Sequence, residues 1–245
     1  MIVLACLATY ACIIYGWTID LPMTIIGIAV VFPIVFSIGG AYKRRENALV
    51  YYGSIKSLSR MIYFASRDWL RDDGEKAEKN IANFKALIER MFSVLRAFFL
   101  TETKEDQEKK ENELYTVFSQ LSNAIEDLRD RGLPTSEVSR VHSFLAKLIT
   151  AFENLKHIFQ YRTPRTLRTY SRVFIYIIPI IYAPYFAHIA DGKPWSFAFI
   201  LPVLFALIFT SLDNIQEQLE NPFDQVGEDD IKIRPEKFAQ NLELK

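Results

Sequence analysis

The sequence predicts an all-α integral membrane protein with four transmembrane helices and a helical domain that lies in water. Apolar residues are concentrated in two pairs of long segments, one pair near each end of the 245-residue chain. Between the pairs, residues 43–172 are polar and show helical periodicity. Half of the chain is apolar and the charged residues are excluded from the apolar blocks, which is typical of membrane proteins.

The four apolar segments have lengths that suit helices crossing a bilayer. They are Ile2–Trp17, Leu21–Tyr42, Val173–Ala190 and Trp195–Leu212. Crossing the hydrocarbon core takes roughly 20 apolar residues. The second and third segments reach or approach that length, and the shorter first and fourth each have a tryptophan at one end that suits the interface. Prolines inside three of the segments favour a packed bundle or an aqueous path, because each leaves a carbonyl that needs another partner.

The distribution of charge predicts the orientation. Residues 43–172 hold 24 Lys and Arg against 18 Asp and Glu, whereas residues 213–245 hold 4 against 9. Basic residues flank the ends of the second and third segments that face this middle region, so the positive-inside rule places it in the cytoplasm with both termini. We therefore predict transmembrane helices in 1–42 and 173–212, a cytoplasmic helical vestibule in 43–172, and a cytoplasmic helix extension with an acidic tail in 213–245. The expected location is the cell membrane.

The middle region contains three apolar stripes with a period of 3.6 residues, which predicts three amphipathic helices. The first runs from Phe84 to Phe98, the second from Leu114 to Leu128 and the third from Val138 to Leu155. Breaks are expected at Asp72–Gly74, in the charged run Glu102–Glu113 and at Gly132–Pro134, where Thr135 or Ser136 is available to cap the next helix.

One stripe in the second apolar segment stands out. Ile28, Phe32 and Phe36 recur at i, i+4 and i+8, so on a helix their side chains form one line. If several copies of this helix surrounded an axis, the line would become a stack of hydrophobic rings, which is one form of channel constriction. On spacing alone, ordinary core or lipid-facing residues are the favoured interpretation of the stripe.

The stretch from Phe32 to Arg60 resembles the bestrophin family of pentameric ion channels. In that family, the second helix carries an aromatic residue with an arginine eight positions later, within an A-Y-x-R pattern and before an aromatic-glycine step. This chain departs from the pattern at Asn47, where the family has a glutamate. The matching residues here are Phe36, Ala41, Tyr42, Arg44, Ala48, Tyr52 and Gly53. A second match follows the fourth apolar segment, and a third is Pro164 with Arg172. The residues of the second match are Leu212, Asp213, Ile215, Glu220, Pro222, Phe223 and Asp229–Asp230.

The resemblance implies a homopentamer in a lipid bilayer that conducts small inorganic ions passively, with chloride and similar anions expected. It places the hydrophobic neck of the pore on Ile28, Phe32 and Phe36. A second, cytoplasmic aperture would fall on Thr135 or Leu133, although helix capping explains Thr135 equally well. Animal members carry a calcium site after the Pro-Phe dipeptide. Here Glu228, Asp229 and Asp230 offer carboxylates, but they come four residues late, so a solvated tail is the favoured interpretation and no cofactor is expected.

Other functional classes find little support in the sequence. It has no glycine-rich phosphate loop, no HExxH and no CxxC motif, so we expect no enzyme and no nucleic-acid partner. Cys6 and Cys12 lie on one apolar helix and point in different directions, which argues against a disulfide or a metal site. Two alternatives stay open: a cation-selective channel, because the predicted neck is uncharged, and a membrane-anchored helical scaffold that conducts nothing.

Overall fold

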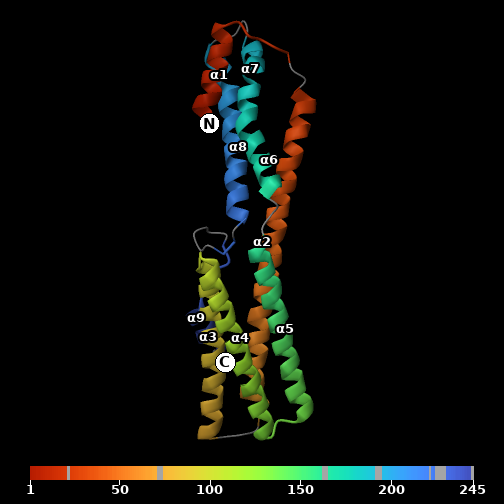
Figure 1. The fold of residues 1–245 in the computed structure, drawn as a ribbon, viewed down its shortest axis with the longest axis vertical. Helices are drawn as coiled ribbons and strands as arrows, with labels where there is room; N and C mark the ends of the chain where they lie inside the picture. Colours follow the sequence, from red (N-terminus) through yellow and green to blue (C-terminus); the bar gives the residue numbers. More distant parts are fainter. Residues whose placement is uncertain are drawn as a thin grey trace. The chain divides into compact units, whose positions relative to one another are not determined.

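The computed structural model contains only helices in the residues that it describes (Figure 1). It describes residues 1–20, 23–70, 74–161, 165–190, 195–220, 222–223 and 230–243, without the side chains of 23–30, 165–168, 170–171, 195–197, 220 and 243. The helices are α1 (Ile2–Ile14), α2 (Met23–Asp68), α3 (Glu75–Leu100), α4 (Lys104–Asp130), α5 (Thr135–Gln160), α6 (Arg165–Ile181), α7 (Ala183–Ile189), α8 (Trp195–Glu220) and α9 (Pro235–Glu243).

The chain divides into two compact units. Unit 1 comprises Met1–Arg45 and Arg162–Asn221, and unit 2 comprises Glu46–Tyr161 and Pro222–Lys245. The first half of α2 therefore belongs to unit 1 and its second half to unit 2.

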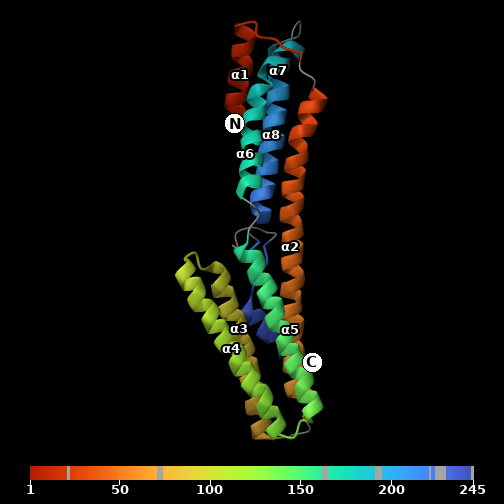
Figure 2. The same cartoon turned by 45° about the vertical axis from the view of Figure 1, so that its right-hand side comes forward.

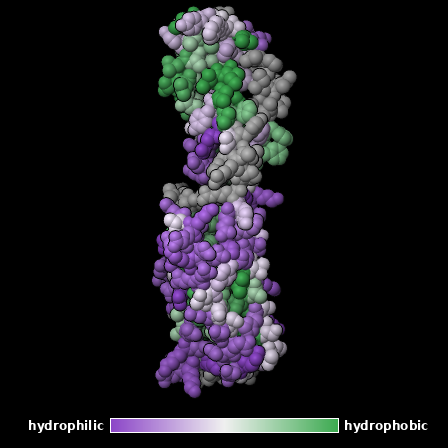
Figure 3. All heavy atoms as spheres, viewed as in Figure 1, coloured by the Kyte–Doolittle hydropathy of each residue, from purple (hydrophilic) through white to green (hydrophobic). Residues whose placement is uncertain are grey.

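Unit 1 is a bundle in which α1, α6, α7 and α8 pack together beside the first half of α2. Its buried apolar residues form two small clusters, one around Ile34, Ile178 and Phe186 and one around Cys12 and Ala187. Most of its other large apolar side chains are exposed, and Figure 3 shows hydrophobic residues on the surface of this unit.

Two stretches in the described part of unit 1 are long and apolar enough to cross a membrane. They are Arg172–Ile189, with 18 residues, and Ala198–Leu219, with 22 residues. The first covers most of the predicted third span, which is divided between α6 and α7 next to Pro184, because a proline donates no N–H to the carbonyl four residues earlier. Helix α1 is apolar but shorter. The predicted second span, Leu21–Tyr42, begins outside the described residues and stays a prediction.

Unit 2 has one continuous apolar core to which α2, α3, α4, α5 and α9 all contribute. Helices α3 and α4 form an antiparallel pair, α4 packs on α5, and α9 packs on α3 (Figure 2). The three predicted stripes form most of this core. All of their members are buried except Leu87, which is partly buried against it. On the face shown in Figure 3, the surface of this unit is mostly hydrophilic.

The ends of the unit 2 helices differ in part from the prediction. Helix α4 begins at Lys104, so most of the charged run is an exposed helix face, and its N-cap Thr103 accepts a hydrogen bond from the Asp106 backbone N–H. The break before α5 is confirmed, with Gly132 at a φ of 96°. The predicted cap there is wrong, because Pro134 is the N-cap and no side chain caps the helix. The Pro134 carbonyl instead accepts hydrogen bonds from the N–H groups of Glu137 and Val138, at 2.8 Å and 3.0 Å.

Candidate functional site on helix α2

The predicted neck residues Phe32 and Phe36 lie on an exposed face of α2. Their side chains are 62% and 59% exposed, and neighbouring Val31 and Val35 are exposed as well. The two phenyl rings contact each other edge to face, with centroids 4.6 Å apart and planes 67° apart. This geometry is favourable for aromatic pairs because the positive edge of one ring meets the negative face of the other. The pair is therefore ordered by its own contact and not by a surrounding core.

The opposite face of the same helix is buried. Ile34, Ser37 and Ala41 are each 1% exposed or less, and Ile34 packs with Ile175 and Ile178 of α6. Helical periodicity explains the division, since these three positions lie on the far side of the helix from Phe32 and Phe36. Packing in the bundle thus fixes the rotation of α2 and presents the Phe32–Phe36 face outward.

The exposed face continues along the helix as a strip without bulky side chains. Gly39 and Gly40 are exposed, and a methyl group built on either would contact nothing. The strip therefore has room for another helix or for lipid to approach the backbone closely. The third predicted neck residue, Ile28, belongs to α2, but the structure does not describe its side chain.

The matched residues Tyr42 and Arg44 follow the strip on α2. Tyr42 is 54% exposed, and Arg44 is half-buried and takes part in an interaction. Neither residue is part of the apolar core of its unit. Their roles stay a prediction.

Two of the matched motifs meet in unit 1. The Arg172 Nε lies 3.5 Å from Asp213 Oδ1, and another Arg172 nitrogen lies 3.6 Å from a Glu217 carboxylate oxygen. The Tyr176 hydroxyl lies 3.5 Å from the other Asp213 oxygen. Asp213 is 9% exposed, so its carboxylate needs this partner. The pairing ties the start of the α6 span to the end of the α8 span. Sequence reasoning named both residues but not their contact, which depends on how two distant segments pack.

The matched Pro-Phe dipeptide has a structural role in unit 2. Phe223 is 1% exposed and stacks on Phe99, with ring centroids 4.3 Å apart and planes 8° apart. The Pro222 carbonyl accepts a hydrogen bond from the Ile231 N–H at 2.8 Å. These contacts fix the chain where it enters the core of unit 2. The side chain of Glu220, which precedes them, lies outside the described residues.

The two candidates for a cytoplasmic aperture occupy different environments. Leu133 is 4% exposed and belongs to the core of unit 2, so within one chain its side chain is used in packing. Thr135 is exposed in the first turn of α5. Of the two, only Thr135 presents its side chain to the outside of the chain.

The acidic tail is described only in part. Asp230 is half-buried and takes part in an interaction, while Glu228 and Asp229 lie outside the described residues. Across the part of the chain that is described, no three His, Cys, Asp or Glu side chains converge as a metal site would require.

The described residues thus form an all-helical fold of two units: an apolar bundle with many exposed apolar side chains, and a second unit with one continuous core of its own. Solved structures of the same fold belong to bacterial Bestrophin homologues. One variant of the homologue from Klebsiella pneumoniae superimposes with a TM-score of 0.78 at 17% identity, covering 98% of this chain and 96% of that one. A second structure of that homologue gives 0.72 at 19% identity, covering 98% and 95%.

A further structure, described as a membrane protein, matches with a TM-score of 0.78 at 19% identity, covering 98% of this chain and 95% of that chain. No protein-family model matches the sequence, and no curated protein matches it. The chain thus has the bestrophin fold over nearly its whole length, which confirms at the level of fold the resemblance seen in its motifs.

Proposed function

We propose that this chain is a subunit of a bestrophin-like ion channel, a homopentamer that conducts small ions passively through a pore lined by α2. The observation that carries the proposal is the outward face of α2, where Phe32 and Phe36 are exposed while Ile34, Ser37 and Ala41 hold the other side of the helix in the bundle. A fold shared over 98% of the chain with Bestrophin homologues supports it. Unit 1 would span the membrane with four segments, both termini being cytoplasmic.

In this proposal the neck is formed by rings of Ile28, Phe32 and Phe36. At a rise of 1.5 Å per residue the three rings occupy about 12 Å of the axis. A narrow apolar passage of this length opposes ions by excluding water, so it can close by dewetting. The positive edges of phenyl rings can replace part of the hydration of an anion.

Chloride and similar small anions are the proposed permeant ions. The middle region 43–172 carries more basic than acidic residues, and a vestibule with that excess would concentrate anions before they reach the neck. The acidic segment 213–245 opposes the effect where it lies near the vestibule. A net positive field should therefore act on selectivity mainly at low salt, where the Debye length is long.

Two measurements test the proposal. The first is the mass of the complex in a mild detergent, since a monomer or dimer cannot surround a pore and would favour the scaffold alternative. The second is a planar-bilayer recording under a potassium chloride gradient. A reversal potential that follows chloride supports the anion channel, and one that follows potassium assigns cation selectivity. If a purified pentamer carries no current, the non-conducting scaffold is favoured.

We further propose that conduction does not require calcium. The acidic residues Glu228, Asp229 and Asp230 come later than the position used by the calcium site of animal bestrophins, and calcium needs six or more oxygen ligands in a fixed arrangement. Currents should persist when calcium is chelated. Loss of current on chelation, its return with added calcium and its absence in Asp229→Ala with Asp230→Ala would show that the tail binds calcium.

A further inference from the structure

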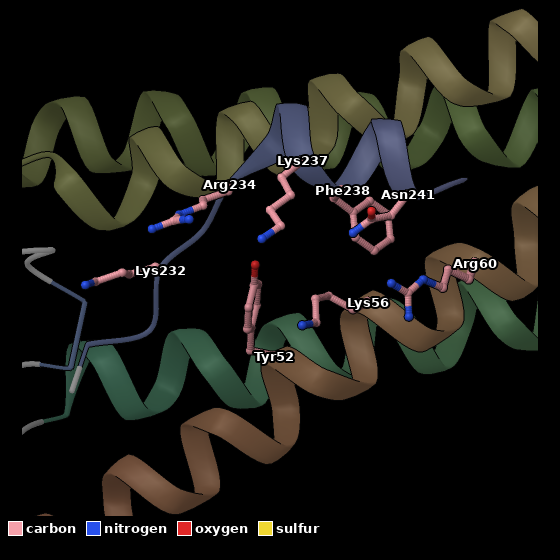
Figure 4. A pocket seen from close by; sticks show the side chains of 8 residues that line it. All are labelled: Tyr52, Lys56, Arg60, Lys232, Arg234, Lys237, Phe238 and Asn241. Atoms are coloured by element: carbon pink, nitrogen blue, oxygen red, sulfur yellow. The ribbon is translucent and has the colours of Figure 1, made fainter. Parts of the chain in front are cut away.

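Unit 2 contains a basic pocket between α2 and the C-terminal segment, with a volume of about 290 Å³ (Figure 4). Its walls come from three parts of the fold: α2, the segment before α9, and α9 itself. The residues that line it are Tyr52, Lys56, Arg60, Lys232, Arg234, Lys237, Phe238 and Asn241. Five of these eight are cations and none is acidic. The volume lies at the lower end of the range of small-molecule sites, about 300 to 1,000 Å³.

The five cations of this basic pocket differ from most other cations of unit 2. Elsewhere in the unit many basic side chains are paired with acids, as in Lys79–Glu75, Arg140–Glu137 and Lys156–Glu111. Among the described residues, no acidic side chain forms an ion pair with any of the five cations that line the pocket. Like charges so close together repel each other, and this repulsion is relieved when an anion lies among them.

Aromatic contacts hold two of these cations in place. The Lys56 ammonium lies 5.2 Å from the centre of the Tyr52 ring, and the Arg60 guanidinium lies 5.3 Å from the centre of the Phe238 ring. Such contacts are favourable because the face of an aromatic ring is negative. They reduce the freedom of two long side chains that would otherwise move in solvent. The α2 wall of the basic pocket is therefore partly ordered before any ligand arrives.

The Tyr52 hydroxyl adds a neutral donor to the basic pocket. Tyr52 is 8% exposed, and its hydroxyl points across the pocket toward the Lys237 ammonium (Figure 4). It forms no hydrogen bond with a described residue. Burial raises the pKa of Tyr52 to about 12, so the phenol keeps its proton at neutral pH and can donate it to an anion.

We infer that the basic pocket binds a ligand carrying two or more phosphate groups. Phosphate oxygens accept hydrogen bonds from ammonium, guanidinium and phenol donors, and charge-assisted bonds of this kind are the strong ones. Five cations on a small pocket exceed the charge of a single phosphate or carboxylate, which favours a polyphosphate group. The ligand would join α9 to α2, and the inference does not depend on whether the chain conducts ions.

The test uses the full-length protein in a neutral detergent, titrated with inorganic tripolyphosphate by calorimetry in a phosphate-free buffer. The test variant is Lys56→Gln with Lys237→Gln, one cation from each wall. Its matched control is Lys76→Gln with Lys147→Gln, which removes the same charge from exposed sites of unit 2 outside the basic pocket. We expect saturable binding of one tripolyphosphate per chain, weakened at least about tenfold in the test variant and unchanged in the control.

A milder variant reports on the hydroxyl. Tyr52→Phe keeps the ring that supports Lys56 and removes only the donor, so binding should weaken by about three- to tenfold with no change in the unfolding midpoint. Raising the salt concentration should weaken binding of the wild type more than that of the test variant, because the test variant has fewer pocket charges for the salt to screen. Failure of the wild type to bind, as when the chain's own acidic residues occupy the pocket, would overturn the inference. So would equal losses in the test and control pairs.

The phosphate groups could belong to a soluble molecule or to a lipid headgroup, and a second arm separates these sources. The protein is placed in nanodiscs of phosphatidylcholine alone or with a phosphoinositide, and the tripolyphosphate titration is repeated. Competition by the phosphoinositide, lost in Lys56→Gln with Lys237→Gln, assigns a lipid headgroup. Equal binding of tripolyphosphate in both kinds of disc assigns a soluble polyphosphate.

Discussion

Units 1 and 2 use the same apolar residue types in opposite ways. In unit 2, Phe92, Phe98 and Phe152 are each 1% exposed or less, within one core to which five helices contribute. In unit 1, Phe32 and Phe36 are exposed on α2, and Ile200 and Leu204 are exposed on α8. Exposure of this much apolar surface to water is unfavourable by roughly 25 cal/mol for each Å². Unit 2 therefore buries most of its large apolar side chains within its own core, whereas unit 1 leaves many of its own exposed.

The two units also differ in how they use charge. Unit 2 has a polar surface with many ion pairs and a half-buried network in which Lys156 contacts Glu111 and Glu153, at 2.8 Å and 2.7 Å. The contact of Arg172 with Asp213 in unit 1 joins two of its helices where the apolar spans meet the polar part of the sequence. In unit 2 the Lys156 network thus joins helices that also share an apolar core. In unit 1 the Arg172–Asp213 contact lies at the ends of the apolar spans.

The largest effect should come from removing the exposed rings of α2. Phe32→Ala with Phe36→Ala should raise single-channel conductance severalfold, because smaller side chains widen the neck and admit water. The control is Ile200→Ala with Leu204→Ala, an exposed pair at the same spacing on α8 of the same unit, and it should leave conductance unchanged. Unchanged currents in the phenylalanine pair, or the same rise in both pairs, would count against a pore along α2.

A core substitution in unit 2 should affect stability instead of conduction. Phe98→Ala removes a ring with no exposed surface that contacts Phe99, Phe152 and Phe159. The expected loss is about 3–5 kcal/mol of unfolding free energy, as for other phenylalanine-to-alanine changes in cores. It is measured as a lower denaturation midpoint in detergent. Phe36→Ala should leave the midpoint nearly unchanged, and an equal loss there would mean that Phe36 is buried against a neighbouring subunit.

An intermediate effect is expected from the Lys156 network, which joins α4 to α5. The Lys156 side chain is 14% exposed, and its ammonium also lies 3.0 Å from the Tyr115 hydroxyl. Burial by itself lowers the pKa of Lys156, but hydrogen bonds with Glu111, Glu153 and Tyr115 outweigh burial and raise it.

Lys156→Met should therefore cost about 1.5–3 kcal/mol, because it leaves two carboxylates facing each other without a cation. Thermal unfolding followed by circular dichroism measures the change. Lys109→Met, which removes only ion pairs with exposed acids on one helix, should leave the midpoint where it was. A Lys156→Met protein as stable as the wild type would show that the network contributes only to the surface.

The smallest expected effect is a difference in stability between substitutions at the N-termini of α4 and α5. Thr103→Ala removes the side-chain cap of α4 and should cost about 1 kcal/mol, visible as a small shift of the unfolding midpoint. Thr135→Ala should cost less, because Pro134 is the N-cap of α5 and the Thr135 hydroxyl caps nothing. A change in ion selectivity with Thr135→Ala at unchanged stability would support the aperture. A loss of stability equal to that of Thr103→Ala would show that Thr135 does cap α5.

Much of this architecture could be predicted from the residues alone. The stripes from Phe84 to Phe98, Leu114 to Leu128 and Val138 to Leu155 predicted α3, α4 and α5 and most of their buried faces, but missed Phe92, Val94 and Phe99 of α3. Amphipathic helices allow this because their periodicity records which face is buried. Periodicity carries less information in unit 1, where both faces of a helix are apolar. There the spacing of Phe32 and Phe36 was compatible with a core, with lipid or with a pore.

Residues close together in the chain were enough to predict α3, α4 and α5, the division between apolar and polar segments, and the motifs shared with bestrophins. Packing between distant segments determines which side of α2 is buried, brings Arg172 to Asp213, and stacks Phe223 on Phe99. The basic pocket has the same origin, since Lys56 and Lys237 lie far apart in the sequence and the packing of α9 in unit 2 places both on one pocket. Long-range packing sets such contacts, and local patterns do not contain them.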